Sequence, residues 1–350
     1  MSKVYQANEI KNVAMLGGSG SGKTTLMESM LFECGVIKRR GSIEAQSTVC
    51  DYFPVEKEYG YSVFSTVCNI EFENKKLNII DCAGSDDFCG GTVAALQMCA
   101  SALIVLSANG GVEVGTQNNF RLVEHAHKPL AFIINKCDHE AADFERTFNQ
   151  LKDCFGNKCT LIQFPVNAGN GFNAVIDVLK GKMLVWKPEG GAPEMKDIPA
   201  EYADKVEEMR AALAEEAAEA DETLLDKFLG EGLSDEEIMQ GLKSVYADGS
   251  MYPVLCCSGL KDMGVRRDVR AGDRRRAAAL AHDRGICAVK ALAVAGAGAA
   301  GLRDGRTDQR HVGGGVYEYR VLTGGGGAVR LPRRRHGRRD CRRARPGDGA

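Results

Sequence analysis

The sequence predicts an α/β fold in which a mostly parallel sheet has helices on both faces. Short apolar runs alternate with longer segments of helical periodicity along residues 13–179. This alternation is typical of parallel strands joined by crossover helices. The apolar runs are also continuous, as expected for strands that helices bury on both faces.

These patterns place each expected element. Strands are predicted at Val13–Leu16, Leu77–Ile80, Ala102–Ser107, Leu130–Ile134, Thr160–Phe164 and Val254–Cys256. Helices are predicted at Lys23–Phe32, Gly91–Ala100, Thr116–His125, Ala142–Cys154 and Asn173–Leu179. With 350 residues, 44% of them hydrophobic, the chain can bury a real core and hold two domains.

The stretch between Trp186 and Met251 has a different character. A loop rich in proline and glycine precedes two acidic amphipathic segments, Glu201–Leu229 and Asp235–Tyr246. Ser234, with a glutamate three residues later, forms a capping box at the start of the second segment. We interpret the acidic residues as a solvated helix face, and a docking surface for a partner is the alternative.

The composition changes abruptly near Arg267. Residues 268–350 hold 19 Lys and Arg against 8 Asp and Glu, although the whole chain has a net charge of −2. They include 18 Arg, 16 Gly and 15 Ala but no Phe or Met, a bias that GC-rich codons would write. We therefore expect a truncated chain whose tail is a frame-shifted translation and is disordered. A genuine basic tail that binds nucleic acid is the alternative.

Together these changes predict four parts: a core of residues 1–186, an inserted helical subdomain of residues 187–250, a return to the core at 251–267, and the tail at 268–350. The 13 cysteines are scattered and never spaced CxxC, so they indicate reduced thiols and no zinc site or disulfide framework. No apolar stretch reaches the length of a membrane span, and the N-terminus lacks the apolar run of a signal peptide. We expect a cytoplasmic protein.

Gly17 to Thr24 reads GGSGSGKT, which fits GxxxxGK followed by Ser or Thr. The segment follows an expected strand and opens an expected helix, and this context separates a phosphate-binding P-loop from a simple Gly/Ser-rich turn. Backbone N–H groups would face the phosphates, Lys23 would neutralise the β and γ oxygens, and the Thr24 hydroxyl would ligate magnesium. The fold class becomes a P-loop NTPase, with nucleotide contacts expected from Gly17, Gly18, Ser19, Gly20, Ser21, Gly22, Lys23, Thr24 and Thr25.

Two further motifs follow expected strands. Asp81 begins a DxxG sequence that ends at Gly84, so the carboxylate could hold magnesium and the glycine amide could meet the γ-phosphate. Asn135-Lys136-Cys137-Asp138 would select the base. The Asp138 carboxylate can accept both N1–H and the 2-amino group of guanine, a donor pair that adenine lacks. Asn135 would brace the loop, and the stem of Lys136 would cover the base.

With these motifs in order, residues 11–261 resemble the GTP-binding domain of elongation factor G, a translational GTPase. Asp51–Thr66 resembles its first switch, and Asp81–Phe88 resembles its DTPGHVDF segment. Gly171–Val178 and Trp186 also match, and Ser258-Gly259-Leu260-Lys261 resembles the SALK loop whose backbone meets the base O6.

The resemblance implies GTP or GDP as ligand and Mg²⁺ held by Thr24, Ser62 and Asp81. It also implies a monomer that acts on the ribosome, touching rRNA and stalk proteins, with no membrane and no sequence-specific DNA as partners. The expected activity is GTP hydrolysis during translocation. A GTP-binding switch module with little hydrolysis, or a ribosomal protection or release factor, is the alternative.

Several positions depart from the family pattern. Gly18 and Gly20 replace the His and Asp of its P-loop, and Tyr59 replaces an Arg of the first switch. Ser85 stands where the family has its catalytic His, and a serine is too short to orient an attacking water. None of the six histidines has an evident route into the site. The candidate catalytic positions are therefore Lys23, Gly84 and Ser85, and hydrolysis is expected to be slow.

Overall fold

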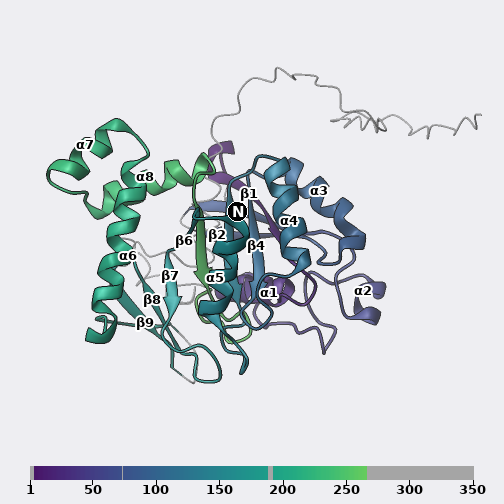
Figure 1. The fold of residues 1–350 in the computed structure, drawn as a ribbon. Coiled ribbons are helices and arrows are strands. Elements are labelled where there is room, and N and C mark those ends of the chain that lie inside the picture. Colours follow the sequence, from purple (N-terminus) through teal and green to yellow (C-terminus); the bar gives the residue numbers. More distant parts are fainter. Residues whose placement is uncertain (1–3, 73, 188–191, 266–350) are drawn as a thin grey trace, which may run out of the picture. The chain divides into compact units, whose positions relative to one another are not determined.

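The computed structural model describes residues 4–72, 74–187 and 192–265, all within one compact unit of the chain. A seven-stranded sheet runs in the order β2-β3-β1-β4-β5-β11-β6. β2 pairs antiparallel with β3, and the other neighbours pair in parallel. The predicted α/β class with a mostly parallel sheet is confirmed (Figure 1). Its strands are β1 (Ile10–Leu16), β2 (Thr66–Phe72), β3 (Lys75–Asp81), β4 (Ser101–Ser107), β5 (Leu130–Asn135), β6 (Cys159–Leu161) and β11 (Tyr252–Cys256).

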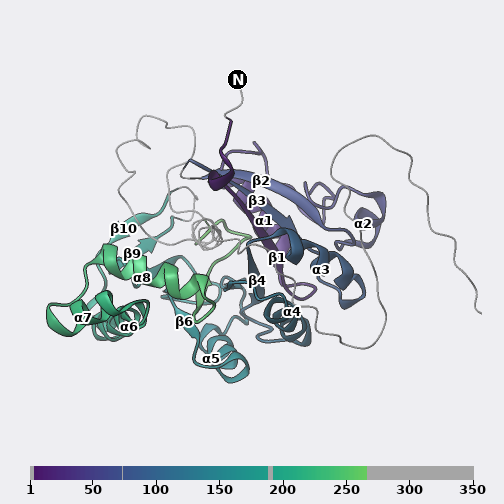
Figure 2. The same cartoon turned by 90° about the horizontal axis from the view of Figure 1, so that it is seen from above.

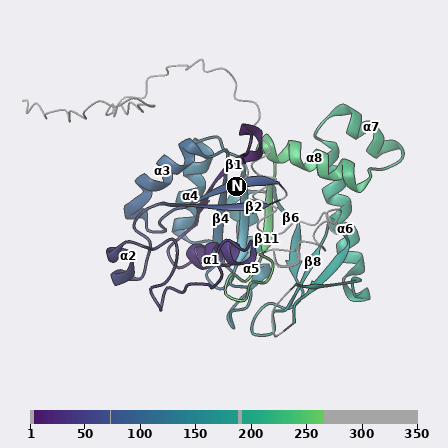
Figure 3. The ribbon, with the colours of Figure 1, turned by 180° about the vertical axis from the view of Figure 1, so that it is seen from behind.

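Helices cover both faces of this sheet. Helices α3, α4 and α5 lie in front of it in Figure 1, and α1 lies in front of it when the molecule is seen from behind in Figure 3. The helices of this part are α1 (Lys23–Glu33), α2 (Pro54–Tyr59), α3 (Cys89–Met98), α4 (Val114–His125) and α5 (Phe144–Phe155), with short 3₁₀ turns η1 (Ala7–Glu9) and η2 (Asp86–Phe88).

The two-sided cover explains the continuous apolar runs. Every residue of β4 and of β5 is buried. Next to these strands, the rings of Phe120 and Phe155 stack with centroids 4.2 Å apart, and Phe132 lies 5.4 Å from Phe155. These rings tie α4 and α5 to β5, and stacked aromatic pairs contribute beyond the area they bury. The strands that carry the site therefore belong to the rigid centre of the core.

A second sheet, of four antiparallel strands in the order β10-β9-β8-β7, was not predicted. It consists of β7 (Gln163–Pro165), β8 (Ala174–Asp177), β9 (Lys182–Val185) and β10 (Glu194–Lys196). The predicted helix at Asn173–Leu179 is wrong, because its centre forms β8. All four β8 residues are buried, and the β-branched pair Val175 and Ile176 favours a strand there.

The predicted strand Thr160–Phe164 is divided between the two sheets, which is also a correction. Ile162 stands at the junction: its N–H donates to the Val254 carbonyl of β11, and its carbonyl accepts from the N–H of Val178. Ile162 thus bonds to the main sheet through Val254 and to the residue that follows β8, so β6 ends before it and β7 begins after it.

The acidic region forms three helices, α6 (Ala200–Ala218), α7 (Glu222–Gly230) and α8 (Asp235–Ala247), which lie together beside the second sheet (Figures 1 and 2). The predicted single segment Glu201–Leu229 is broken because Asp221 starts a new helix. Its carboxylate accepts the N–H groups of Thr223 and Leu224, both at 2.9 Å. β11 then returns the chain to the main sheet between β5 and β6.

The other domain boundaries remain predictions. The boundary between residues 186 and 187 falls between β9 and β10, which pair with each other. The predicted tail, its frame-shift origin and its disorder concern residues 268–350, which lie outside the described residues. Within the part of the chain that the structure describes, no helix is both long enough and apolar enough to span a membrane.

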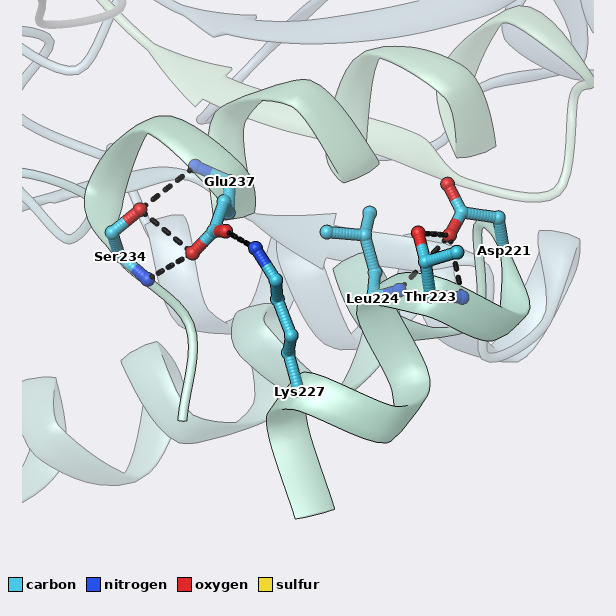
Figure 4. A network of polar contacts seen from close by, with 6 residues as sticks. All are labelled: Asp221, Thr223, Leu224, Lys227, Ser234 and Glu237. Carbon is cyan, nitrogen blue, oxygen red and sulfur yellow. Dashed lines mark hydrogen bonds and ion pairs between the residues drawn. The ribbon is translucent and has the colours of Figure 1, made fainter. Parts of the chain in front are cut away.

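The capping box at the start of α8 is confirmed and is drawn in Figure 4. Ser234 Oγ accepts the N–H of Glu237, and the Glu237 carboxylate accepts the N–H of Ser234 at 3.0 Å and forms an ion pair with Lys227 of α7. The ammonium of Lys227 and the donors of Ser234 hold the pKa of Glu237 down at about 2. One carboxylate thus closes the end of α8 and joins it to α7.

We predict that Ser234→Ala lowers the free energy of unfolding by about 1 kcal/mol, the usual cost of losing a helix N-cap. Urea titration followed by circular dichroism measures this change. The matched control is Ser244→Ala, on the exposed face of the same helix, which should leave stability unchanged or slightly raised because alanine favours helix. Equal effects of the two substitutions would contradict the role given to the cap.

Candidate nucleotide-binding site

The predicted motifs meet at one edge of the main sheet. Each follows the carboxyl end of a parallel strand: the P-loop follows β1, Asp81 ends β3, Asn135 ends β5 and Ser258 comes after β11. Carboxyl ends of parallel strands share an edge, which is where open α/β sheets bind ligands. A cavity of about 550 Å³ lies there. Of the predicted site residues, it is lined by Ser19, Gly20, Gly22, Lys23, Thr24, Thr25, Ser62, Gly84, Ser85, Asn135, Lys136, Asp138 and Leu260.

The remaining predicted residues are buried and do not line the cavity. They are Gly17, Gly18, Ser21, Asp81, Ser258 and Gly259. The cavity also has lining residues that the sequence did not single out as site residues, namely Ile43, Glu44, Asp51, Gly60, Tyr61 and His139. Most of these come from the segment between α1 and β2, whose sequence has no regular period, so only its resemblance to the first switch pointed to the site.

The P-loop wraps closely around Lys23. Gly17 has φ 147° and a Cβ there would lie 2.1 Å from the Val105 carbonyl oxygen, so only glycine fits. Gly22, the N-cap of α1, has φ 87°. The Lys23 ammonium donates to the carbonyls of Gly17 and Gly18, both at 2.9 Å. Burial lowers the pKa of Lys23, and the nearby Asp81 carboxylate counteracts part of that shift.

The three predicted magnesium ligands come together. The Thr24 hydroxyl donates to Asp81 Oδ2 at 3.2 Å and lies 3.2 Å from the Ser62 hydroxyl. Asp81 is buried, and its pKa is raised to about 7, mainly because of that burial. The Lys23 ammonium opposes this rise, and the Asp51 carboxylate adds to it. Asp81 Oδ1 is buried with no hydrogen-bond partner among the described residues.

Asp51, the first residue of the switch-like segment, is a further site residue that its local sequence does not predict. Its Oδ1 accepts from the Ser62 hydroxyl at 2.6 Å, and its Oδ2 accepts from Thr48 at 3.2 Å. Asp51 and Ser62 are eleven residues apart, on either side of α2, so no local spacing could have connected them.

These contacts fit a magnesium ion. A hydroxyl has one proton to donate, and the protons of Thr24 and Ser62 go to Asp81 and Asp51. The two hydroxyl oxygens lie 3.2 Å apart, and each has lone pairs that a cation can use. Two such oxygens and an unpaired carboxylate oxygen form the hard oxygen donor set that Mg²⁺ prefers.

Two buried carboxylates hold the segment between α1 and β2 in place. Glu28 of α1 is fully buried and accepts the N–H groups of Gly41, at 2.8 Å, and of Val49. Glu56 of α2 accepts the N–H groups of Val63 and Phe64, both at 3.0 Å. The segment that carries Asp51 and Ser62 is thus fixed on both sides of the magnesium candidates.

Asn135 joins the two ends of the cavity. Its side-chain amide donates to the carbonyls of Ser21 and Gly22, at 3.2 and 3.3 Å, and its oxygen accepts the N–H of Gly259 at 2.9 Å. The side chain therefore braces the P-loop against the loop after β11. Lys136 follows with φ 60°, a left-handed backbone that turns the chain sharply where Asp138 lines the cavity.

Ser85 lines the cavity, and its hydroxyl lies 3.5 Å from Asp87 Oδ2. The expectation that no histidine enters the site needs correction, because His139 also lines the cavity. The chain turns back after Asp138, with the N–H of Ala142 donating to the His139 carbonyl, and this turn keeps His139 at the sheet edge. His139 Nδ1 accepts the N–H of Ala141 at 3.1 Å.

Fold and site together define a P-loop protein built to hold a guanine nucleotide. Residues 8–293 match the model of the elongation factor Tu GTP-binding domain. A crystal structure of a protein from Thermus thermophilus superposes with a TM-score of 0.69 at 31% sequence identity, and the match covers 74% of this chain and 39% of that one. The chain therefore belongs to the elongation factor Tu GTP-binding domain family, the nucleotide-binding part of translational GTPases.

Family membership identifies the class of protein and its ligand. The chain is a GTP-binding domain of a translational GTPase, and this family hydrolyses GTP and works in translation. The aligned part is 39% of the Thermus protein's length. The family match continues to residue 293, past Arg267, whereas the described residues end at Val265. The boundary at Arg267 stays a prediction.

We predict that Gly84→Ala weakens GTP binding by roughly tenfold or more, since overpacking costs about 1–3 kcal/mol. A Cβ on Gly84 would lie 2.5 Å from Lys23 Nζ and 2.9 Å from the Gly18 carbonyl oxygen. Titration with a fluorescent GTP analogue measures the affinity. Gly90→Ala is the control, because a Cβ at Gly90 meets nothing within 4 Å. Unchanged affinity in Gly84→Ala would contradict the close approach.

Proposed function

We propose that this chain is the GTP-binding domain of an elongation factor G-type translation factor, which couples GTP to ribosomal translocation. The observation that carries the proposal is the group of helices α6–α8, which follows β10 of the second sheet and precedes β11, the strand that returns the chain to the nucleotide-binding sheet. The acidic segments of this sequence also resemble the helical subdomain that elongation factor G inserts inside its GTP-binding domain. The switch-like segment and the loop after β11 support the same assignment.

The site residues divide the work between the base and the phosphates. Asp138 accepts the N1–H and 2-amino donors of guanine, while the backbone of Ser258, Gly259 and Leu260 meets O6. Lys23, with the N–H groups of the P-loop, neutralises the phosphate oxygens. The Gly84 amide meets the γ-phosphate.

Thr24, Ser62 and Asp81 would hold Mg²⁺, and Asp51 would orient the Ser62 hydroxyl toward it. When bound, the ion neutralises charge on the β- and γ-phosphates. The fixed loops around these residues keep their oxygens in place before the nucleotide arrives, so little reorganisation is left for the bound state.

Ser85 favours a second candidate function, a GTP-binding switch with little hydrolysis. An imidazole at this position could reach a water beside the γ-phosphate, whereas the Ser85 hydroxyl is short and lies near Asp87. Water-positioning groups and transition-state contacts are worth orders of magnitude in phosphoryl transfer. Binding and conformational switching need neither.

The proposed partners of this chain are ribosomal RNA and ribosomal stalk proteins. The chain itself is proposed to be a cytoplasmic monomer. Helices α6–α8 expose many carboxylates, including Glu201, Glu207 and Glu208 of α6, which would suit a basic protein surface. The proposed partner surface lies on elements separate from the nucleotide cavity.

We predict that the domain binds GTP and GDP but not ATP, and that Asp138→Asn shifts preference toward xanthine nucleotides. The 2-oxo group of xanthine accepts a hydrogen bond, which an amide can donate and a carboxylate cannot. Competition against a fluorescent GDP measures each affinity. Glu140→Gln removes an equal charge two residues away and should retain guanine preference. Equal binding of ATP and GTP by the wild type would show the base assignment to be wrong.

We predict slow GTP turnover even with ribosomes, and an increase in turnover for Ser85→His of about tenfold or more, within the range of general acid–base and positioning effects. Single-turnover assays with radiolabelled GTP measure the rate, and Ser85→Ala should match the wild type. If ribosomes stimulate the wild type as strongly as a family member that carries the histidine, Ser85 does not limit hydrolysis.

A further inference from the structure

Arg40 reaches from the segment between α1 and α2 to the loop that follows β11. Its Nη1 donates to the Leu260 carbonyl at 2.8 Å, and its Nη2 donates to the Gly259 carbonyl at 2.7 Å. The guanidinium also forms an ion pair with Asp262 at 2.8 Å, and only about a fifth of each of these side chains is exposed. Charge-assisted contacts of this kind are stronger than neutral hydrogen bonds.

Both ends of this contact are held from behind. Asp262 has φ 58°, and the same carboxylate oxygen accepts from the Ser29 hydroxyl of α1 at 2.6 Å. Next to Arg40, the Gly41 N–H donates to the buried Glu28 carboxylate. The guanidinium of Arg40 therefore extends from a fixed backbone, and the loop to which it donates is itself bonded to α1.

The contact fixes the direction of a backbone donor. In a trans peptide the N–H and C=O groups point to opposite sides, so the bond from Arg40 to the Gly259 carbonyl sets where the Leu260 N–H points. The N–H groups of Ser258, Gly259 and Lys261 already donate to Met263, Asn135 and Ser258. Among residues 258–261, only the Leu260 N–H has no acceptor in the described part of the chain, and Leu260 lines the cavity.

We propose that Arg40 is a positioning residue for base recognition: its fork holds the Gly259–Leu260 peptide so that the Leu260 N–H meets the 6-oxo group of the base. This inference rests on the proposed binding of guanine nucleotides. Arg40 itself touches no nucleotide in this scheme. A lysine could supply the charge but could not hold both carbonyls and Asp262 in one plane.

The test compares three nucleotides in wild type and Arg40→Ala. GDP and IDP both carry the 6-oxo group, whereas the diphosphate of 2-aminopurine riboside lacks it. Competition against a fluorescent GDP analogue gives each equilibrium affinity, and stopped-flow gives GDP dissociation. Arg39→Ala is the matched control, because Arg39 is exposed and has no hydrogen bond or ion pair with another described residue.

In Arg40→Ala we expect GDP and IDP each to bind roughly tenfold more weakly, with GDP leaving correspondingly faster. The 2-aminopurine nucleotide should bind both proteins alike, since it cannot use the Leu260 N–H. Arg39→Ala should match the wild type for all three. A variant that merely loosened the domain would weaken all three ligands.

Arg40→Lys provides a milder change if Arg40→Ala does not fold. It should weaken GDP and IDP several-fold and leave the 2-aminopurine nucleotide unchanged. Affinities like the wild type in both variants, or equal losses for all three nucleotides, would overturn the role of Arg40 while leaving guanine binding intact. A wild type that does not prefer GDP would overturn the proposed function and this inference together.

Discussion

The side chain of Asn135 holds together two loops that lie more than a hundred residues apart in the sequence. Its amide donates to the P-loop carbonyls of Ser21 and Gly22 and accepts the N–H of Gly259. The contact with Gly22 is so close that a Cβ there would lie 2.6 Å from the amide nitrogen. Residue 22 must therefore be a glycine for Asn135 to make these contacts. A change in either residue would alter how the P-loop and the loop after β11 are placed relative to each other.

Most of the fold followed from local pattern, and so did the motifs at the sheet edge. β4 and β5 were predictable because each is a continuous buried run, and Lys23 and Asn135 were predictable because their neighbours in sequence are also their neighbours in the motif. Strand β8 was missed because its four residues, all buried in an unexpected second sheet, carry no alternation to separate a strand from a helix turn. Its identity depends on partners elsewhere in the chain.

The contacts that the sequence could not reveal come from the segment between α1 and β2. Asp51 and Arg40 lie in this segment, and each acts on residues with which it shares no periodic spacing. What fixes them is a pair of carboxylates on helices, Glu28 and Glu56, which accept backbone N–H groups of the segment. Buried carboxylates need such partners, because an unpaired one is costly. Tertiary hydrogen bonding, and not local propensity, gives this segment its shape.

The same segment joins the two halves of the site. At the proposed phosphate end, the Asp51 carboxylate accepts a hydrogen bond from the Ser62 hydroxyl, whose oxygen lies 3.2 Å from that of Thr24. At the proposed base end, the Arg40 guanidinium donates hydrogen bonds to the carbonyls of Gly259 and Leu260. Hydroxyl oxygens are hard donors, so the arrangement at Ser62 suits the proposed magnesium ion. A nucleotide that engages both ends would therefore stabilise one stretch of backbone from both sides. By thermodynamic linkage, any contact that orders this segment also raises the affinity of the domain for the nucleotide.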